Sequence, residues 1–465
     1  MAQPDAEYQL LRRTYKVGAD GTIDITLRKE LKLIRNRAFT AYADKGETFI
    51  VYNPSFESLK INESYTVRAD GSKVTTPPNA FVEQLPSEAQ NCGRYNALRE
   101  MALVHTALEY GCTIVLDYTI HRRSNKLYDE FSTVMDCPVK HFEVVIDDPQ
   151  HMLYATYDAD FSHNGNTYSL TNIPQSTIDS YMPANTNGKH FVVSSVKPED
   201  YPTLFTIDSE TIPDAASTIS NLTKDDPVAY AATLRDYVVD YIRLNNLQPN
   251  QLNFQHANAA TVWNSGCGTA IEKNILLAAM LRQAGYQAQV LLRNSKWLVQ
   301  CTIDGIDYLM SATDTRKPPL FIPDLARPSD IIVNRQLAWA PTNLGNSYYL
   351  VELPADSGHV DLRSQLLTSV RTAPLNIPNA CESYTYTLAL PDSLNLQLLT
   401  KELNFKSSKE GKWDIGVTIR RTANTVQVTR TMTLTAGTLE GKDYKAFRQA
   451  LQKWDTTRQL HFKAQ

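Results

Sequence analysis

Cys267 is the residue of this sequence best placed to do chemistry. It stands between Gly266 and Gly268, just before a long apolar segment that is predicted to be a helix. The positive end of a helix dipole favours thiolate over thiol, and flanking glycines let another chain approach the sulfur closely. A nucleophilic cysteine requires such a setting. The alternative is a small buried cysteine at a helix start, since free cysteines are mostly buried and unreactive.

The base that a nucleophilic cysteine needs is harder to find. No histidine occurs between Cys267 and His359. His256 precedes Cys267 on another predicted element, where a lone histidine is more often a surface or helix-end group. Lys296 would stabilise a thiolate, but it acts as a base only if burial lowers its pKa from about 10.4. Adjacent strand residues face opposite ways, so only one of Ser295 and Lys296 can face the sulfur.

Helices followed by strands are predicted around Cys267. Asp226 is suited to cap a helix, and Pro227 to occupy its first turn without losing a hydrogen bond. Residues 275–281 are apolar on every side, so the helix that contains them must be buried. The expected elements are helices from Pro227, over 256–263 and over 268–284, then strands over 287–293, 296–303 and 306–310. This order indicates an α+β domain.

Alternating apolar and polar residues predict β-structure on both sides of this domain. Residues 8–196 carry tight-turn signals at Asp20-Gly21 and Asp70-Gly71, which favours a β-sandwich. Prolines near 197–210 indicate a linker. Beyond residue 355 the alternation returns, with one helix whose apolar face holds Tyr444, Phe447, Leu451 and Trp454. The predicted domains are 1–205 (N-terminal β-sandwich), 206–353 (central α+β domain) and 354–465 (C-terminal β-domain).

Composition excludes several classes of function. Forty-six basic residues against 50 acidic ones give a net charge of −4, so we expect no nucleic-acid binding. No two of the six cysteines have the two-residue spacing of metal or dithiol sites, and we expect no metal and no cofactor. No run of about 18 apolar residues predicts a transmembrane segment. The polar N-terminus leaves a cytosolic start and a removed export signal equally open.

Residues 231–314 resemble the core of bacterial transglutaminase-like proteins. The resemblance lies in residues 265–268, in the helix over 271–285 and in the hairpin that ends at 308–314. The flanking regions are similar to the uncharacterised β-domains that often precede and follow this core in exported bacterial proteins. The resemblance implies an α+β multidomain fold with a papain-like centre, and a periplasmic or extracellular location.

The same resemblance implies a catalytic triad of which one member remains. In that family a cysteine attacks an acyl group, a histidine on the next strand is its base, and an aspartate orients the histidine. Cys267 matches the nucleophile. The histidine position falls on Ser295 or Lys296, and the aspartate position on Ser311. Asp314 is three residues further on, about 10 Å along a strand and on the opposite face.

We therefore expect a catalytically inactive protein with a binding or scaffolding role towards a peptide, a glycan or a partner protein. Trp263 and Trp297 are the candidates for lining its groove. The alternative is an active cysteine peptidase or acyltransferase that uses Cys267 with Lys296 or His256 as an unusual base. A purely structural scaffold with a filled groove is a third possibility. The sequence leaves the ligand, the oligomeric state and any disulfides open.

Overall fold

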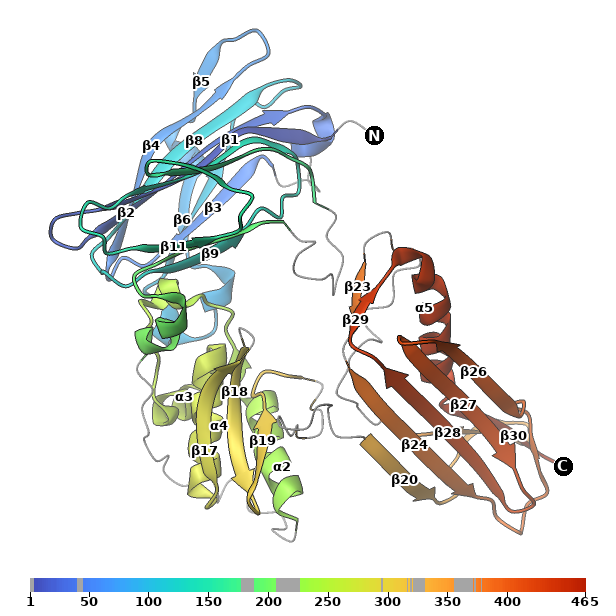
Figure 1. Cartoon of the computed structure of the whole chain (residues 1–465). Helices are drawn as coiled ribbons and strands as arrows, with labels where there is room; N and C mark the ends of the chain where they lie inside the picture. Colours follow the sequence, from blue (N-terminus) through green and yellow to red (C-terminus); the bar gives the residue numbers. More distant parts are fainter. Residues whose placement is uncertain are drawn as a thin grey trace.

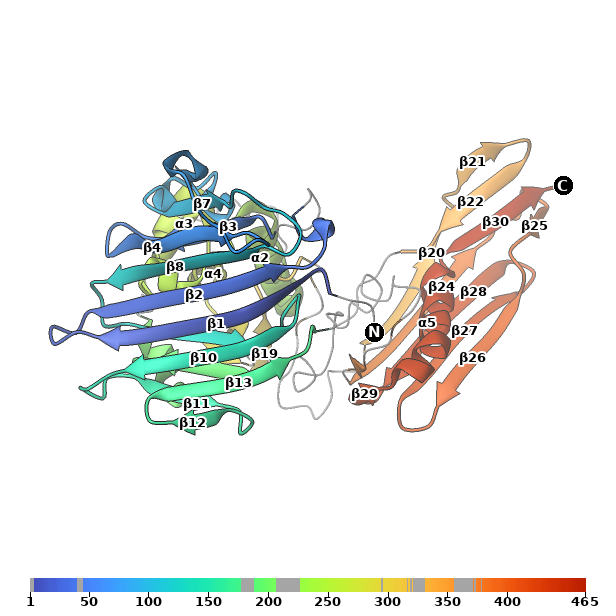
Figure 2. The same cartoon turned by 90° about the horizontal axis from the view of Figure 1, so that it is seen from above.

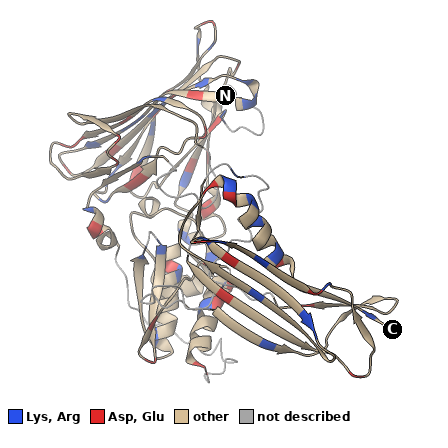
Figure 3. Cartoon of the chain, turned by 45° about the vertical axis from the view of Figure 1, so that its right-hand side comes forward, with Lys and Arg blue, Asp and Glu red and all other residues tan. Residues whose placement is uncertain are grey.

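The computed structural model describes residues 4–39, 45–176, 188–205, 226–293, 296–315, 317, 320, 331–354, 371, 374–377 and 379–465. These residues form an N-terminal β-structure, a central part in which three helices and a small sheet are described, and a C-terminal β-structure whose described residues include one long helix (Figure 1). Acidic and basic residues are intermixed over these parts (Figure 3). Within the described residues, no helix is both long and apolar enough to cross a membrane.

The N-terminal part is built on one large sheet. Two three-stranded sheets lie below it in Figure 1, and Figure 2 shows its long strands side by side. The large sheet has the order β12 (Ser162–Asn164), β13 (Thr167–Ile173), β10 (Val139–Asp147), β1 (Ala6–Val17), β2 (Ile23–Leu33), β8 (Thr113–Arg122), β4 (Glu57–Val67) and β5 (Lys73–Thr75). One small sheet has the order β11 (Tyr154–Tyr157), β14 (His190–Ser194) and β9 (Tyr128–Ser132). The other has the order β3 (Glu47–Tyr52), β7 (Arg99–Val104) and β6 (Phe81–Gln84).

Turn chemistry and apolar alternation explain these strands. Gly21 and Gly71 adopt positive φ values of 80° and 85° in the turns that follow β1 and β4, as the Asp-Gly signals predicted. Tyr15 and Phe142 on the large sheet and Phe191 on β14 are fully buried in one shared cluster. A layer of aromatic side chains therefore joins the large sheet to a small one.

The central part contains the predicted helices and strands. They are α2 (Pro227–Tyr241), α3 (Ala259–Ser265), α4 (Ala270–Gln283), β17 (Gln287–Arg293), β18 (Lys296–Ile303) and β19 (Ile306–Met310). The Asp226 side chain accepts the N–H groups of Val228 and Ala229, both at 3.0 Å, which confirms the predicted helix start. α3 starts later than predicted because Asn258 caps it by accepting the N–H of Thr261 at 2.9 Å.

The predicted fold class, an α+β multidomain protein with a papain-like centre, is wrong. Strands account for 48% of the structure and helical segments for 19%, so the chain is largely β. The helices predicted around Cys267 suggested an α+β class, but that class does not extend to the whole chain. Both flanking parts put their apolar residues on strands, and among their described residues only the C-terminal part has a long helix.

The C-terminal part is a five-stranded sheet covered by α5 (Gly441–Thr456), with a smaller sheet beside it (Figures 1 and 2). The larger sheet has the order β20 (Ile331–Leu337), β24 (Ala380–Ala389), β28 (Thr425–Leu434), β27 (Trp413–Arg421) and β26 (Leu403–Lys409). The smaller one has the order β21 (Thr342–Gly345), β22 (Tyr348–Glu352), β30 (Gln459–Ala464) and β25 (Leu396–Leu398), and β23 (Leu375–Ile377) pairs with β29 (Gly437–Leu439). Strands from residue 331 onward thus pair within the C-terminal sheets.

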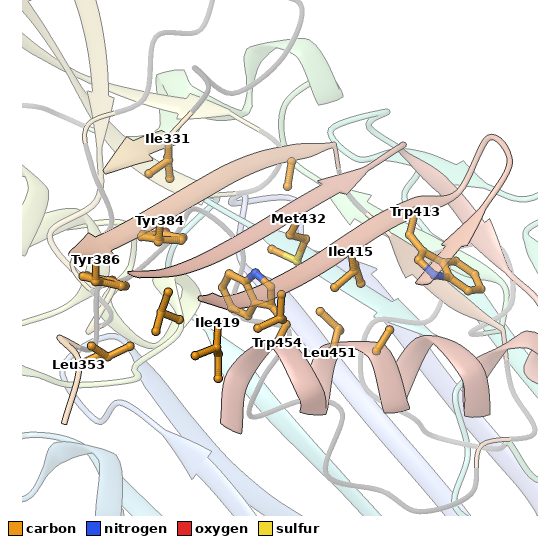
Figure 4. Close-up of a cluster of buried hydrophobic side chains, with 14 of the residues drawn as sticks. Ile331, Leu353, Tyr384, Tyr386, Trp413, Ile415, Ile419, Met432, Leu451 and Trp454 are labelled. Atoms are coloured by element: carbon orange, nitrogen blue, oxygen red, sulfur yellow. The ribbon is translucent and has the colours of Figure 1, made fainter. Parts of the chain in front are cut away.

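Apolar packing joins α5 to its sheet. Figure 4 shows Leu451 and Trp454 of the helix facing Ile415, Ile419 and Met432 of the strands. The four residues predicted for the apolar face of this helix are all buried. Their burial confirms that face.

Phe447→Ala should therefore destabilise the C-terminal part. Phe447 is fully buried, and truncating it leaves a cavity, so we expect a loss of about 3–5 kcal/mol in the free energy of unfolding. Urea unfolding followed by circular dichroism measures this loss. Gln449→Ala on the exposed face of the same helix is the matched control, with an expected change within about 0.5 kcal/mol. Equal stability of the two variants would contradict the packing described above.

Candidate functional site

Cys267 forms a disulfide with Cys92, which lies 175 residues earlier in the chain. The two Cα atoms are 6.1 Å apart, and both cysteines are 2% exposed. Cys92 belongs to the 85–98 loop, which connects β6 to β7 and contains two short 3-10 helices, Ser87–Ala89 and Gly93–Tyr95. In this state Cys267 has no free thiol. It joins the N-terminal part covalently to the segment that precedes α4.

The glycines beside Cys267 serve the local fold. Gly266 has a φ of 63° and ends α3, donating its N–H to the Val262 carbonyl at 3.0 Å. A Cβ on Gly268 would lie 3.2 Å from side-chain atoms of both Val262 and Glu272. One glycine is required by backbone conformation and the other by close packing. The expectation that they leave the sulfur open to another chain is wrong, because the disulfide and its neighbours bury it.

A short strand pair fixes this segment in place. β16 (Cys267–Gly268) runs parallel to β15 (Arg243–Leu244), and the N–H of Asn245 donates to the Gly268 carbonyl at 2.9 Å. The predicted helix from residue 268 therefore begins two residues later, at Ala270. Apolar side chains of the 85–98 loop pack around the disulfide together with Leu247.

Glu272, one turn into α4, is the polar centre of this region. Its carboxylate is 1% exposed and accepts both terminal nitrogens of Arg94, each at 3.2 Å, as well as the Tyr95 hydroxyl. The backbone N–H groups of Ala257 and Thr269 donate to it at 2.7 and 2.8 Å. Burial by itself raises the pKa of Glu272, but the hydrogen bonds from Arg94, Tyr95 and Ala257 outweigh it and lower the pKa.

The next two residues of α4 are also buried polar groups with partners. Lys273 donates to the carbonyls that end α2, Ile242 at 2.6 Å and Val239 at 3.3 Å. Burial lowers its pKa to about 8. Asn274 donates to the Trp297 carbonyl at 3.2 Å and accepts the N–H of Ala312 at 3.1 Å. Together with Glu272, these side chains tie α4 to the 85–98 loop, the end of α2, β18 and the chain after β19.

The positions that correspond to the missing histidine and aspartate of a triad lie as follows. Lys296 is exposed at the start of β18, opposite Arg293. Ser295 lies outside the described residues. The Ser311 hydroxyl is bonded to that of Thr313 at 3.0 Å.

The two tryptophans that were predicted to line a groove lie in different places, and only one of them lines the cavity. Trp263 stacks on Tyr237 with 5.6 Å between ring centroids and is not part of the cavity wall. Trp297 and His256 both belong to that wall. The described residues contain no group of three or more side chains suited to hold a metal ion.

A cavity of about 780 Å³ lies where the N-terminal and central parts meet. Its wall combines β9, the 3-10 helix Pro198–Leu204, the 245–256 segment, the start of α4, and the Leu292–Trp297 pair of β17 and β18. The size suits a small ligand or one segment of a larger one. Sequence analysis found only Trp297 and His256 of this wall. The other wall residues come from segments far apart in the chain, so the sequence does not show that they meet. The amide-rich run 245–250 is the sequence feature that could have indicated a binding segment.

Hydrogen bonds hold the two sides of the cavity together. Asn250 accepts the N–H of Tyr128 at 3.2 Å and donates to the Tyr128 carbonyl, so its side chain pairs with the backbone of β9 as a strand would. Arg122 is 1% exposed and paired with Glu57, and it donates twice to the Asn250 carbonyl at 3.1 Å. These contacts make the cavity a preformed feature of the chain.

Family comparison finds domains of unknown function at both ends of the chain. Residues 19–179 match the model of DUF3857 and residues 347–462 that of DUF3858, each described as a domain of unknown function with a solved structure. No significant match exists among curated proteins. The identification of a transglutaminase-like core is wrong, because the matches show no such family. The motif around Cys267 that suggested it is accounted for by a helix end, a close contact and a disulfide.

Comparison with solved structures finds a similarity over nearly the full length. A crystal structure described as "a putative protease" from Parabacteroides distasonis is 26% identical, covers 99% of both chains and has a TM-score of 0.74. Yeast LTA4 hydrolase is 11% identical over 41% of this chain and 29% of its own, with a TM-score of 0.22. An M1 zinc metallopeptidase from Deinococcus radiodurans is 10% identical over 61% and 65%, with a TM-score of 0.20. Only the first similarity is close enough to describe a shared architecture.

Glu272→Gln should destabilise the folded protein by about 3 kcal/mol at pH 7, because the half-buried Arg94 would keep its charge without its partner. A carboxylate with a lowered folded pKa stabilises fully above its ordinary pKa of 4.5, and this contribution is lost as pH falls through the lowered value. The gap between the parent protein and the variant should therefore shrink at pH 3.5.

Urea unfolding at the two pH values measures the gap. Glu410→Gln, at an exposed residue of the C-terminal part, is the control and should match the parent at both. A Glu272→Gln variant as stable as this control would show that the carboxylate is dispensable.

Proposed function

We propose that this protein binds a ligand in the cavity between its N-terminal and central parts and does not use Cys267 as a nucleophile. The observation that carries the proposal is the Cys92–Cys267 disulfide, which occupies the only sulfur at the candidate nucleophile position and buries it. A thiolate is required for nucleophilic attack, and a disulfide-bonded sulfur supplies none. Peptides, glycans and segments of partner proteins are the ligand classes proposed for the cavity.

Rigid attachment of the two cavity walls supports a binding role. A preformed site loses little conformational freedom when its ligand binds, so more of the contact energy appears as affinity. The disulfide, the Arg94–Glu272 pair and the reciprocal Asn250–Tyr128 bonds all lie beside the cavity. These bonds keep the cavity in one shape.

An active cysteine peptidase or acyltransferase is the second candidate. The observation that favours it is the full-length similarity to the Parabacteroides protein described as a protease. Such an activity would require reduction of the disulfide and a base for the released thiol. Lys296 is exposed at the start of β18, whereas a lysine acts as a base only where it is desolvated.

We also propose an oxidising location, periplasmic or extracellular. Disulfides persist in such compartments and are rare where glutathione and thioredoxin keep thiols reduced. The Cys92–Cys267 bond joins segments 175 residues apart, and it supports this location.

Native protein treated with iodoacetamide should remain unlabelled at Cys92 and Cys267, as read by peptide mass spectrometry. After reduction, hydrolysis of casein should stay at background. If reduction instead produced hydrolysis that Cys267→Ala abolishes and Cys381→Ser leaves intact, the binding proposal would fail and the peptidase would replace it. Cys381 lies in the C-terminal part, outside the Cys92–Cys267 disulfide, and serves as the matched control.

Binding itself is tested with peptide and glycan arrays. Trp297→Ala should weaken the affinity for any ligand that the array captures by at least about tenfold, because Trp297 forms part of the cavity wall. Trp263→Ala, which changes a tryptophan outside the wall, should leave that affinity within about twofold. Equal losses in the two variants would place the ligand elsewhere.

A further inference from the structure

We infer that the ligand group taken by this cavity is an alkylammonium, as carried by a lysine side chain or a free amine. The inference rests on the proposed binding function and names its chemistry. Three independent features of the wall point to it: a contiguous set of aromatic rings, carboxylates without a cationic partner, and a buried amide oxygen without a donor.

The aromatic rings of the wall form one chain of contacts. Tyr128 and Tyr201 lie 4.0 Å apart between ring centroids, and Tyr201 and Phe205 lie 5.3 Å apart. Phe205 in turn contacts Phe254 at 5.5 Å and Trp297 at 4.9 Å. All five belong to the cavity wall. Ring faces attract cations within about 6 Å, and desolvated sites strengthen this attraction.

The charges on the wall are all negative. Glu130 on β9 and Glu199 in the 3-10 helix Pro198–Leu204 belong to the wall, and neither forms an ion pair with another described residue. Asp129 is already bound by Arg13 at 2.7 Å and by the Tyr15 hydroxyl. No Lys or Arg occurs among the described wall residues. A cationic ligand would supply the missing partner, whereas an anion would meet only repulsion.

Lys126 is the nearest cation along the chain to β9, and it is engaged elsewhere. Its ammonium donates to the Leu204 carbonyl at 3.1 Å, on the far end of the 3-10 helix from Glu199. Lys296 adjoins Trp297 in sequence but is exposed and is not part of the wall. Neither lysine therefore neutralises the carboxylates of the cavity.

Asn245 adds an amide acceptor to the residues of the wall. It is 3% exposed, its amide nitrogen donates to the Glu88 carbonyl at 2.8 Å, and its Oδ1 has no donor. Leaving a buried acceptor unpaired costs about 1–3 kcal/mol, so a donor that reached this oxygen would recover that cost. An ammonium group carries three donors and no acceptor, which suits a wall that holds an amide oxygen without a donor and carboxylates without a cationic partner; among the described residues, Glu130 accepts only the Tyr128 hydroxyl, at 3.4 Å.

Isothermal titration of the oxidised full-length protein tests the inference with four probes. They are 1,5-diaminopentane, a pentapeptide with one central lysine, the same peptide with that lysine acetylated, and maltopentaose. The diamine or the lysine peptide should bind, and acetylation should weaken the peptide at least about tenfold, since it removes the charge. Affinity should fall as ionic strength rises, because exposed carboxylates are screened.

Variants separate the contributions of the wall. Glu130→Gln combined with Glu199→Gln should weaken lysine-peptide binding about tenfold, while Glu410→Gln should not change it. Tyr201→Phe keeps the ring and should bind as the parent does, whereas Tyr201→Leu should bind several times more weakly. These substitutions lie at partly exposed residues and are expected to preserve the fold.

The outcomes distinguish failure of the ammonium inference from failure of the proposed binding function. Binding of the lysine peptide but not the diamine supports a peptide as the source of the ammonium, and the reverse supports a free amine. Binding of maltopentaose that depends on Trp297, with no binding of either amine, overturns the ammonium inference and leaves the binding function intact. Equal affinity for the acetylated and free lysine peptides overturns the inference as well.

Discussion

Three consecutive polar side chains at the start of α4 impose the constraint on which the rest of the structure depends. Glu272, Lys273 and Asn274 are at most 2% exposed, and each would be costly to bury without partners. Each finds them on a different segment: Glu272 on the 85–98 loop and Ala257, Lys273 at the end of α2, and Asn274 on β18 and the chain after β19. Satisfying all three fixes the relative positions of these segments.

The cavity follows from that arrangement. The Arg94–Glu272 pair and the disulfide hold the 85–98 loop against α4, and Asn250 holds the 245–256 segment against β9. The wall is thereby assembled from segments that no single element could bring together. A site supported in this way keeps its shape by hydrogen bonds and a covalent bond, and it leaves its aromatic and acidic groups facing the space between the two parts.

The same arrangement changes the meaning of Cys267. A cysteine between two glycines before a buried helix has the local features of a nucleophile, and those features led to a family that the comparisons do not show. The structure gives each feature a local cause: the positive φ of Gly266, the 3.2 Å contacts that a side chain on Gly268 would make, and a bond to Cys92. A short sequence motif can reflect the conformation that the backbone must adopt as readily as it reflects a catalytic role.

Local signals in the sequence determined most of the individual elements. Asp226 and Pro227 set the start of α2, the apolar run 275–281 required a buried helix, and alternation with Asp304-Gly305 gave β17, β18 and β19 at their observed bounds. These features depend on neighbours within a few residues, so the sequence displays them directly. The class of the whole chain was not predicted correctly, because it depends on the share of residues in strands and on how the sheets combine.

Only the tertiary structure decided what the site is. The Cys92–Cys267 disulfide, the bonds of Arg94 and Tyr95 to Glu272 and the wall of the cavity join residues from segments far apart in the chain, and local spacing carries no record of such contacts. The sequence offered Cys267 as a thiol with a missing base. Folding placed a second sulfur against it, and the polar groups that the sequence analysis had passed over became the walls and supports of a binding cavity.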